Sequence, residues 1–404
     1  MARTLEDYRD IVGDDAISEI HRKAAKLYGR HIMNINSTYQ GGGVSEMLAP
    51  LVHLLNDVGV LCGWRILHGN PEFFTITKKF HNALQGDAVN LTPVKQRLYA
   101  EANERVSRFT HIGHDCVIVH DPQPLPLIAF YTKRQPWVWR CHVDLSHPNQ
   151  ELWTFLKRYV LRYDSVVVSH ERYRQSDLPV EQRVIHPAID PLSAKNADIT
   201  EAALVKALRK FKVPTDKPFI VQISRFDKWK DPLGVVEAFR LVREKVDCRL
   251  VLCGSMAADD PEGSQVYERI RRRAQEWSRD QEVILVTAEN SVLVNALQRK
   301  AAVVVQKSLR EGFGLTVTEA LWKARPVVAS RVGGIKLQIE DGVSGFLVEP
   351  DDIPGCADRI VRLLLDPKLG DEFGRQGQKK VRDSFLITRL LRDYLDMLQE
   401  LLSR

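Results

Sequence analysis

The sequence predicts an α/β protein built from two doubly wound parallel-sheet domains. The chain has 404 residues, more than one compact core usually holds at roughly 150 residues per domain. Short apolar segments alternate with segments of helical periodicity, a pattern typical of a parallel sheet covered by helices. The alternation breaks near residues 187–193 and starts again at residue 219. We therefore expect domains over residues 1–200 and 201–380, then a C-terminal helix over residues 381–404 whose packing against the first domain is left open.

The first half alternates between helices and strands. Residues 5–27 carry apolar side chains at near-helical spacing, and a short strand over residues 31–36 follows. A glycine turn over residues 41–43 separates this strand from a helical segment. The remaining expected elements are helices over residues 44–58 and 151–163 and buried strands over residues 116–120 and 165–169.

The second half repeats this pattern. Ligands of open α/β sheets bind at the carboxyl ends of the strands, so the residues directly after each strand are the candidates for function. A last helix with apolar periodicity spans residues 385–402. Five apolar segments predict strands, over residues 219–224, 249–254, 282–286, 302–306 and 326–329.

The composition is that of an ordinary globular protein, with 44% hydrophobic and 27% charged residues. The net charge of +6 comes from 58 basic and 52 acidic residues, and so small an excess indicates no nucleic-acid partner. The basic run over residues 269–273 fits the solvated face of a helix.

Cysteine usage and the N-terminus predict a cytoplasmic protein with no membrane partner. The N-terminal 30 residues lack the apolar core of a signal peptide, and no apolar run approaches the roughly 20 residues of a membrane span. The six cysteines form no Cys-x-x-Cys pair and have no histidine at metal-ligand spacing, so we expect buried free thiols. They stand at positions 62, 116, 141, 248, 253 and 356.

The glycine triplet Gly41-Gly42-Gly43 lies between a predicted strand and a helix. Backbone amides and a helix N-terminus at such a turn can bind an anion or a sugar hydroxyl. The segment is not a dinucleotide fingerprint, because Glu46 stands where glycine or alanine is required, and no lysine of a phosphate-binding loop follows. A tight turn without a ligand is the alternative interpretation.

Two cations follow the first strand of the second domain. Arg225 and Lys230 lie in the segment Ser-Arg-Phe-Asp-Lys-Trp-Lys over residues 224–230. An arginine fork and a compact lysine charge can together bind a diphosphate and balance the charge on a departing nucleotide. The alternative is that both are surface cations without a ligand.

The most informative segment is Arg-Glu-Gly-Phe-Gly-Leu-Thr-Val-Thr-Glu-Ala over residues 310–320. Glu311 and Glu319 are eight positions apart across a glycine turn and an expected helix start near Gly314. The first amides of that helix can face a phosphate. Glu311 is then placed to hold sugar hydroxyls and Glu319 to hold ribose hydroxyls, whereas the alternative makes Glu319 a solvated helix residue.

These motifs resemble the large retaining glycosyltransferase family typified by glycogen synthase and sucrose-phosphate synthase. The resemblance rests on Arg225 and Lys230, on Glu-Gly-Phe-Gly-Leu-Thr-x-x-Glu over residues 311–319, and on Gly-Gly-Ile over residues 333–335. It implies a GT-B fold, in which two Rossmann-like domains face each other across a cleft. The first domain then binds the acceptor and the second binds the nucleotide-sugar donor.

More narrowly, the chain resembles the trehalose glycosyltransferring synthases over nearly its whole length. This resemblance implies transfer of glucose from a nucleoside diphosphate glucose to free glucose, which gives α,α-trehalose, with the reverse reaction also open. The motifs that carry it are Leu-Glu-Asp-Tyr-Arg at 5–9, Phe-His-Asn-Ala-Leu-Gln-Gly at 80–86, Val-His-Asp-Pro-Gln-Pro at 119–124, Trp-Arg-Cys-His-Val-Asp-Leu-Ser at 139–146 and Gly-Gly-Ile-Lys at 333–336.

Residue by residue, the resemblance makes Arg225 and Lys230 the diphosphate clamp and Glu319 the ribose ligand. His142 matches a histidine near the transferred sugar, although a histidine beside a strand is more often a structural hydrogen-bonding group. The candidate catalytic residues are therefore Arg225, Lys230, Glu311 and His142. The candidate donor-binding residues are Gly42, Gly43, Phe313, Gly314, Leu315 and Glu319, and the candidate acceptor-binding residues are Asp121, Gln123 and Asp144.

One residue departs from the family pattern. Asp231 follows Lys230 where many members have glycine, a change we expect to affect only the loop.

Metal and cofactor are not expected to take part. Metal-dependent glycosyltransferases usually carry an Asp-x-Asp pair, and this sequence has none. Two cations and a helix N-terminus can neutralise the diphosphate instead. No carboxylate is marked as a covalent nucleophile, so the resemblance implies front-face displacement with retention.

Several alternatives stay open at the level of sequence. A retaining trehalose phosphorylase, or a transferase to another acceptor, would have a similar donor half. A sugar-nucleotide epimerase and a nucleotide-sugar-binding regulator without catalysis are more distant alternatives. The donor base and the oligomeric state do not follow from the sequence, and a homodimer is one arrangement left open.

Overall fold

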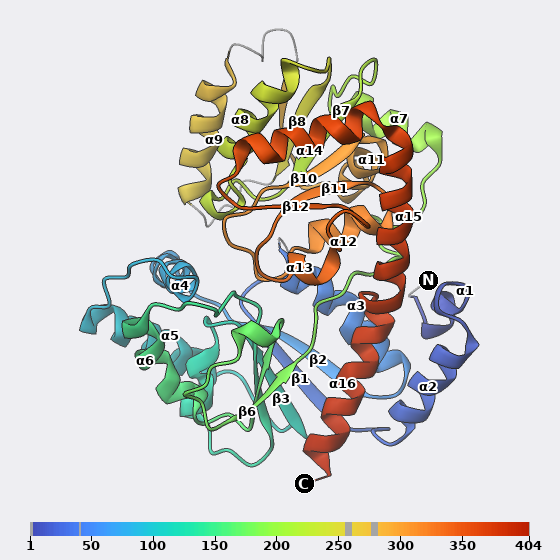
Figure 1. The fold of residues 1–404 in the computed structure, drawn as a ribbon. Helices are drawn as coiled ribbons and strands as arrows, with labels where there is room; N and C mark the ends of the chain where they lie inside the picture. The colour runs from blue at the N-terminus through green and yellow to red at the C-terminus, as the bar shows by residue number, and fades with distance from the viewer. Residues whose placement is uncertain (1–2, 40–41, 255–260, 276–281, 404) are drawn as a thin grey trace. The chain divides into compact units, whose positions relative to one another are not determined.

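The computed structural model describes residues 3–39, 42–254, 261–275 and 282–403 (Figure 1). The chain divides into two compact units. The first unit comprises Met1–Ala188 and Ile387–Arg404, and the second unit is the continuous segment Ile189–Leu386.

The first unit contains a six-stranded sheet in the order β2-β1-β3-β4-β5-β6. Every neighbouring pair is parallel. The central strands β3 and β4 are buried throughout, whereas the polar edge strand β6 is only half-buried. The strands are β1 (His31–Asn36), β2 (Leu61–Ile66), β3 (Cys116–His120), β4 (Trp137–Cys141), β5 (Ser165–Val168) and β6 (Glu181–Val184).

Helices connect these strands, as parallel pairing requires. Three of the four connecting α-helices begin with a Pro near the N-terminus or with an Asn or Thr side chain that accepts a backbone N–H, which are common helix starts. The helices are α3 (Gly43–Asp57), α4 (Pro71–Leu84), α5 (Pro93–Ser107) and α6 (Gln150–Val160), with short 3₁₀ turns η2 (Leu125–Phe130) and η3 (Glu171–Tyr173). Their apolar faces and the sheet enclose a core that includes Trp137, Trp139 and Trp153.

The N-terminal segment corrects one expectation. Residues 5–27 do not form one helix but three short pieces: η1 (Leu5–Tyr8), α1 (Arg9–Val12) and α2 (Asp14–Ala25). The break lies at Gly13, whose φ of 83° is in the left-handed region that favours glycine. Apolar periodicity continues across Gly13, so the sequence pattern alone did not reveal the break.

The last helix, α16 (Ile387–Leu402), packs against α2 and α3 in the first unit. Its apolar face is buried, and Tyr394 accepts a hydrogen bond from Nη1 of the buried Arg140 at 2.8 Å. Lys23 on α2 forms an ion pair with Asp396. The C-terminal helix therefore completes the core of the first unit.

The second unit contains a six-stranded parallel sheet in the order β12-β11-β10-β7-β8-β9. The strands are β7 (Phe219–Ile223), β8 (Arg249–Gly254), β9 (Val283–Thr287), β10 (Val303–Gln306), β11 (Val327–Ser330) and β12 (Phe346–Val348). The helices are α7 (Glu201–Lys210), α8 (Pro232–Arg243), α9 (Pro261–Arg273), α11 (Ser291–Lys300), α12 (Leu315–Trp322), α13 (Ile335–Gln338), α14 (Ile353–Leu365) and α15 (Pro367–Ser384), with the 3₁₀ turn η4 (Lys228–Lys230).

These two sheets confirm the predicted fold class. In each sheet the chain first winds to one side of its starting strand and then crosses to the other side. The change of direction lies between β1 and β3 in the first sheet and between β7 and β10 in the second. At such a switch point the connections leave in opposite directions and open a crevice for ligands.

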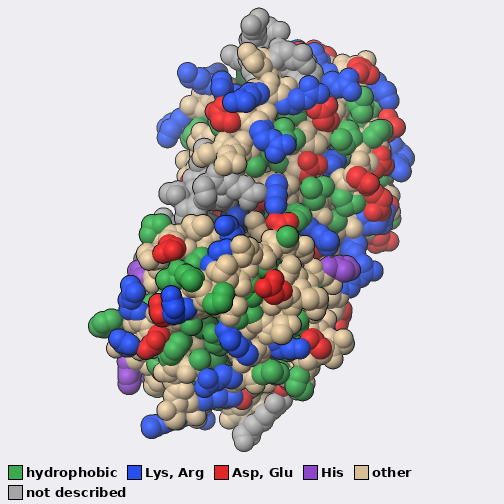
Figure 2. All heavy atoms as spheres, turned by 90° about the vertical axis from the view of Figure 1, so that its left-hand side faces the viewer, with side chains coloured by type: hydrophobic (Ala, Val, Ile, Leu, Met, Phe, Trp, Pro, Cys, Tyr) green, Lys and Arg blue, Asp and Glu red, His purple; other side chains and the backbone are tan. Residues whose placement is uncertain are grey.

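The cysteine prediction is also confirmed, because all six cysteines are free and buried. The four arginines between residues 269 and 273 are exposed on α9 while Ile270 is buried, as expected for a solvated helix face. In Figure 2, acidic side chains lie among the basic ones on the face shown. Among the described residues, no helix is both long and apolar enough to span a membrane.

Candidate functional site

The turn after β7 places Arg225 and Lys230 at the switch point of the second sheet. Asp227 organises this turn, because its Oδ1 accepts the backbone N–H of Trp229 at 2.8 Å at the start of η4. Arg225 is anchored more loosely: its side chain is 40% exposed, and its Nη2 atom lies 3.7 Å from Oδ2 of Asp227. An exposed guanidinium near a strand end is accessible to an anion.

Asp231 ends this turn in the left-handed conformation, with φ 45° and ψ 52°. Aspartate is one of the few residues other than glycine that tolerate this region. Its side chain accepts the N–H of Gly234 at 3.0 Å, which caps α8, and forms an ion pair with the buried Lys307. Asp231 thus adopts the left-handed conformation that favours glycine, and its contacts with α8 and Lys307 extend beyond the loop to which we expected the change to be confined.

Lys230 contacts Glu311 directly. Its Nζ atom lies 2.6 Å from Oε2 of Glu311, which is 7% exposed and follows β10. The same carboxylate oxygen accepts the Ser308 hydroxyl at 3.1 Å, and the Lys230 carbonyl accepts Nε2 of Gln222 at 2.7 Å. Two predicted residues 81 positions apart are thus fixed together because β7 and β10 are neighbours.

The turn at Gly314 begins α12, as predicted. Gly314 is the N-cap residue and has φ 88°, and a Cβ atom there would lie 3.1 Å from Cγ1 of Ile335 and 3.3 Å from Cγ of Glu311. The buried Gln338 holds the turn: its Nε2 donates to the Phe313 carbonyl at 2.6 Å, and its Oε1 accepts the Thr318 hydroxyl at 2.7 Å. By helix geometry the first two amides of α12, at Leu315 and Thr316, have no intrahelical acceptor, whereas the Val317 N–H donates to the Gly314 carbonyl at 2.9 Å.

Glu319 is buried on α12, with 3% exposure, so it is not a solvated helix residue. Its Oε1 lies 3.7 Å from Nζ of Lys195. Lys323, one helical turn later, donates to the Glu319 carbonyl, to Asn196 and to Gln298 at 2.8 to 3.1 Å. Burial lowers the pKa of Lys323 to about 7, and the Glu319 carboxylate opposes that shift. A buried carboxylate with lysines nearby is a candidate acceptor of hydrogen bonds from hydroxyl groups.

In the first unit, His142 follows β4 and is half-buried. Its backbone N–H donates to Oδ1 of Asp121 at 2.8 Å, and Asp121 in turn donates its N–H to the Arg140 carbonyl at 2.9 Å. Asp121 has φ 63°, and burial raises the pKa of its carboxyl to about 7. Asp121 therefore positions the backbone at His142.

The His142 ring contacts a second histidine that the sequence did not single out. Nε2 of His142 lies 3.0 Å from Nδ1 of His120, and the two rings are stacked at a centroid distance of 5.3 Å. Burial, together with the charge of Arg140, lowers the pKa of both histidines well below the usual value. Burial at this position therefore favours the neutral form of both imidazoles.

The other two candidate acceptor-binding residues, Asp144 and Gln123, differ in how their side chains are held. Asp144 is buried, and its Oδ1 accepts the backbone N–H and the hydroxyl of Ser146 at 2.8 and 2.6 Å, which forms a tight turn. The Gln123 carbonyl accepts Nδ2 of Asn103 at 3.1 Å, while its side-chain Oε1 is buried without a hydrogen-bond partner among the described residues.

The glycine turn follows β1. Gly42 is the N-cap of α3 with φ 137°, and its carbonyl accepts the Ser45 hydroxyl at 3.0 Å. Gly43 is the first residue of α3. Gly41 lies outside the described residues.

The predicted residues therefore lie in two groups. Those of the second unit gather where β7, β10 and α12 meet, and those of the first unit lie after β1, β3 and β4. Sequence reasoning missed the polar residues that hold them, among them Gln338, Ser308 and His120. Each of the last two could have been found as a polar residue at or just after the end of an apolar strand segment.

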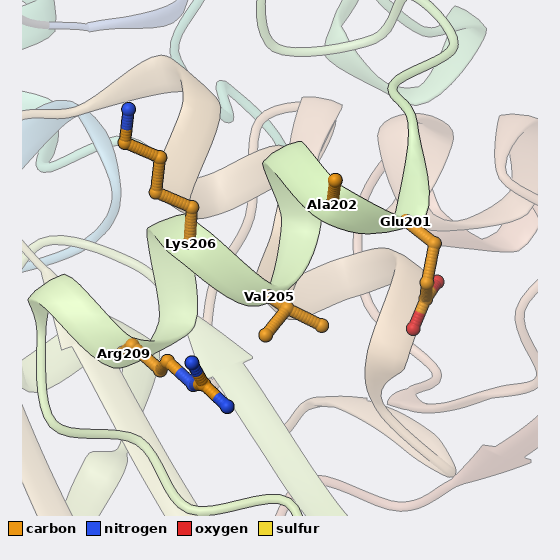
Figure 3. A pocket seen from close by; sticks show the side chains of 5 residues that line it. All are labelled: Glu201, Ala202, Val205, Lys206 and Arg209. Carbon is orange, nitrogen blue, oxygen red and sulfur yellow. The ribbon is translucent and has the colours of Figure 1, made fainter.

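Two further features contribute nothing to these groups. Within the described residues, no cluster of three or more His, Cys, Asp or Glu side chains is arranged to hold a metal ion. A hollow beside α7 is lined by residues of that helix (Figure 3), and none of them is a predicted site residue: Glu201, Ala202, Val205, Lys206 and Arg209. We assign it no function.

Comparison with known families covers both units. A family model described as "Trehalose synthase, N-terminal domain" matches residues 34–175, and one described as "Glycosyl transferases group 1" matches residues 206–380.

Individual relatives extend this comparison along the chain. A trehalose synthase of Thermococcus litoralis is 45% identical over 400 residues, which cover 98% of this chain and 97% of the relative. A trehalose phosphorylase of Pleurotus pulmonarius is 30% identical over 419 residues, which cover 90% of this chain and 56% of the relative. The solved structure of a UDP-forming α,α-trehalose-phosphate synthase from Burkholderia xenovorans, in complex with glucose-6-phosphate, is similar with a TM-score of 0.71 at 15% identity. That similarity covers 92% of this chain and all of the other.

Proposed function

Because this chain belongs to the trehalose synthase family of GT-B glycosyltransferases, we propose that it transfers glucose from a nucleoside diphosphate glucose to glucose. The product is α,α-trehalose, and the reaction is reversible. The observation that carries this proposal is the 2.6 Å contact between Lys230 and Glu311 beside the start of α12. It joins a cation for the diphosphate to a carboxylate for the sugar at one switch point.

The donor is held by residues of the second unit. Arg225 and Lys230 bind the diphosphate oxygens, and the amides at Gly314 and Leu315 add the positive end of α12. Glu319 accepts the ribose hydroxyls and Glu311 the hydroxyls of the transferred sugar. Glu311 also keeps Lys230 in place, so the cation needs little reorganisation when charge develops.

Transfer proceeds on one face of the sugar. The bond between C1 and the phosphate oxygen breaks, and the acceptor oxygen forms a bond to C1 from the same side. The acceptor's proton passes to the departing phosphate oxygen, so atoms and charge balance without a covalent enzyme intermediate. Arg225 and Lys230 stabilise the nucleoside diphosphate that leaves.

We propose that the reaction needs no metal ion. The sequence contains no Asp-x-Asp pair, and the two cations with the helix start supply positive charge for the diphosphate. The direct check is turnover after chelation by EDTA, which should be unchanged. A loss of turnover that Mg²⁺ restores contradicts this part of the proposal.

The decisive experiment is a donor panel with glucose as acceptor. ADP-, UDP- and GDP-glucose are each incubated with glucose, and the product is identified by mass and by the configuration at both anomeric carbons. A nonreducing disaccharide with two α configurations, formed only with a nucleotide donor, supports the proposal. Absence of any disaccharide with all three donors contradicts it.

A trehalose phosphorylase is the second candidate, because one such relative is 30% identical over 90% of this chain. In that reaction glucose 1-phosphate and glucose give trehalose and inorganic phosphate. A parallel incubation with glucose 1-phosphate separates the two candidates. Trehalose formed from glucose 1-phosphate, and not from any nucleotide donor, selects the phosphorylase.

A further inference from the structure

A chain of three polar side chains crosses the interior of the first unit. Nε2 of His120 lies 3.0 Å from Oδ1 of Asn34, and Nδ1 of His120 lies 3.0 Å from Nε2 of His142. Asn34 and His120 are fully buried in β1 and β3, the strands of the switch point. His142 at the far end is half-buried.

The register explains why these residues meet. Asn34 pairs with Ile118 across β1 and β3, and His120 pairs with Arg140 across β3 and β4. Because side chains alternate along a strand, Asn34 and His120 share one face of the sheet. His142, two positions after Arg140, continues that face.

The orientation of the Asn34 side-chain amide is set by the contact of its nitrogen with Cys62. Its Nδ2 donates to Sγ of Cys62 at 3.2 Å, and Sγ has the Gly63 carbonyl as an acceptor at 3.9 Å. The amide oxygen of Asn34 therefore faces His120. A carbonyl oxygen only accepts, so Nε2 of His120 must carry a proton.

The proton on Nε2 of His120 determines where His142 carries its own proton. A neutral imidazole carries a proton on only one ring nitrogen, so Nδ1 of His120 is an acceptor. The partner atom, Nε2 of His142, must then donate. The remaining nitrogen of His142, Nδ1, is left with a free electron pair.

Arg140 keeps both histidines neutral in the hydrogen-bonded series Asn34–His120–His142, which we call the relay. Its guanidinium is fully buried and is held by the hydroxyl of Tyr394 and the carbonyl of Ile185. A fixed positive charge beside two buried imidazoles disfavours a second positive charge there. Protonation of His120 would also place its Nδ1–H against the Nε2–H of His142.

We propose that Asn34 and His120 are positioning residues that fix His142 in the Nε2–H tautomer, so that Nδ1 accepts a hydrogen bond from a sugar hydroxyl. The identity of the ligand rests on the proposed function, whereas the tautomer does not. The sugar hydroxyl then donates its proton to Nδ1 of His142, and the hydroxyl oxygen remains available to accept hydrogen bonds from other donors. A histidine of the opposite tautomer would present an N–H to the same hydroxyl.

The test measures the tautomer directly by ¹⁵N NMR of protein labelled at histidine, with the signals of His142 assigned from H142Q. Protonated and unprotonated ring nitrogens give well-separated signals. We expect the proton of His142 on Nε2 in the native protein. A proton on Nδ1 overturns the proposal whatever the activity.

Two substitutions test the relay itself. N34L removes the acceptor, and we expect the proton of His142 to move to Nδ1 and kcat/KM to fall about fivefold to tenfold, as for one lost hydrogen bond. The matched control is C116A, which truncates another buried side chain of β3 that takes no part in these contacts and should leave the tautomer and kcat/KM unchanged. N34A replaces N34L if the larger side chain prevents folding.

The outcomes separate this inference from the proposed function. If N34L, or N34A in its place, keeps the native tautomer, Asn34 does not control His142 and the inference fails. If the donor panel finds no trehalose but the tautomer behaves as expected, the relay stands and the assigned substrate is wrong.

Discussion

Nζ of Lys230 lies 2.6 Å from Oε2 of Glu311, although the two residues are 81 positions apart in the sequence. Lys230 belongs to the turn after β7 and Glu311 to the turn after β10, and these strands are adjacent. The contact gives Lys230 two functions, since it compensates a buried carboxylate and supplies positive charge for a diphosphate. The two functions respond differently to substitution.

K230A should lower kcat about a hundredfold or more, because one preorganised charge is lost. It should also lower the free energy of unfolding by about 1–3 kcal/mol, because Glu311 loses a charged partner in a buried position. Steady-state kinetics and urea unfolding measure the two effects. K228A, an exposed lysine in the same turn, is the control and should change neither.

The double variant K230A/E311Q should recover stability without recovering activity, because the buried charge is gone but the clamp is still missing. Recovery of turnover in the double variant contradicts the assigned function of Lys230.

R225A should also lower kcat about a hundredfold. Its side chain is 40% exposed, so the free energy of unfolding should change by less than about 0.5 kcal/mol. The control is R240A, an arginine of similar exposure on α8. Native turnover in folded R225A removes Arg225 from the diphosphate site.

E319Q should weaken donor binding about tenfold, because hydroxyl groups bond more strongly to a carboxylate than to an amide. Calorimetric titration with the nucleoside diphosphate measures this change. The control is E237Q on α8, a glutamate paired with arginines outside the predicted site, which should leave nucleotide affinity unchanged. An unchanged affinity in E319Q means that the ribose lies elsewhere.

G314A should destabilise the protein more than G342A. Both glycines have positive φ, at 88° and 78°, so each alanine carries a backbone cost of about 1–2 kcal/mol. Only Gly314 adds close contacts, with Ile335 and Glu311, whereas a Cβ at Gly342 meets nothing within 4 Å. Thermal unfolding gives the difference, and kinetics should show an activity loss in G314A alone. Equal losses of stability would mean that only the backbone matters.

Asp121 should make stability fall as pH rises. Burial raises the pKa of its carboxyl from 3.8 to about 7, so between these values the folded state binds more protons than the unfolded state. The free energy of unfolding therefore decreases across this window, with a limiting slope of about 1.4 kcal/mol per pH unit.

D121N isolates this contribution, because asparagine tolerates positive φ and keeps the acceptor for the His142 amide. The difference in unfolding free energy between D121N and the native protein should grow in favour of D121N from about pH 4 to about pH 7. A constant difference across that range shows that Asp121 ionises at its ordinary pKa.

The sequence predicted most strands where apolar residues are continuous and missed three of the four edge strands. The central strand β3 was identified within its observed bounds, because buried parallel strands are apolar on both faces. The edge strands β2, β6 and β12 were not singled out, and neither was the central strand β4, whereas the edge strand β9 was expected over residues 282–286. Edge strands are short or partly polar, as in β6 with Glu-Gln-Arg-Val, and such segments resemble loops.

The site divides in a similar way. Arg225, Lys230 and Glu311 could be proposed because they follow predicted strands, and Gly314 because glycine favours the left-handed region. Their supporting contacts depend on register and long-range pairing, which a single sequence does not contain. The contact between His120 and His142 illustrates this, since it exists only because β3 and β4 are neighbours.

The hydrogen bond between Arg140 and Tyr394 has a consequence for biosynthesis. The second unit is continuous in sequence and is fully synthesised once residue 386 has been added. The first unit begins earlier but receives α16 only after the second unit has been added. During translation, the later-starting unit is therefore the first to have all of its residues, and the buried guanidinium of Arg140 gains its hydrogen bond to Tyr394 only after the whole second unit has been synthesised.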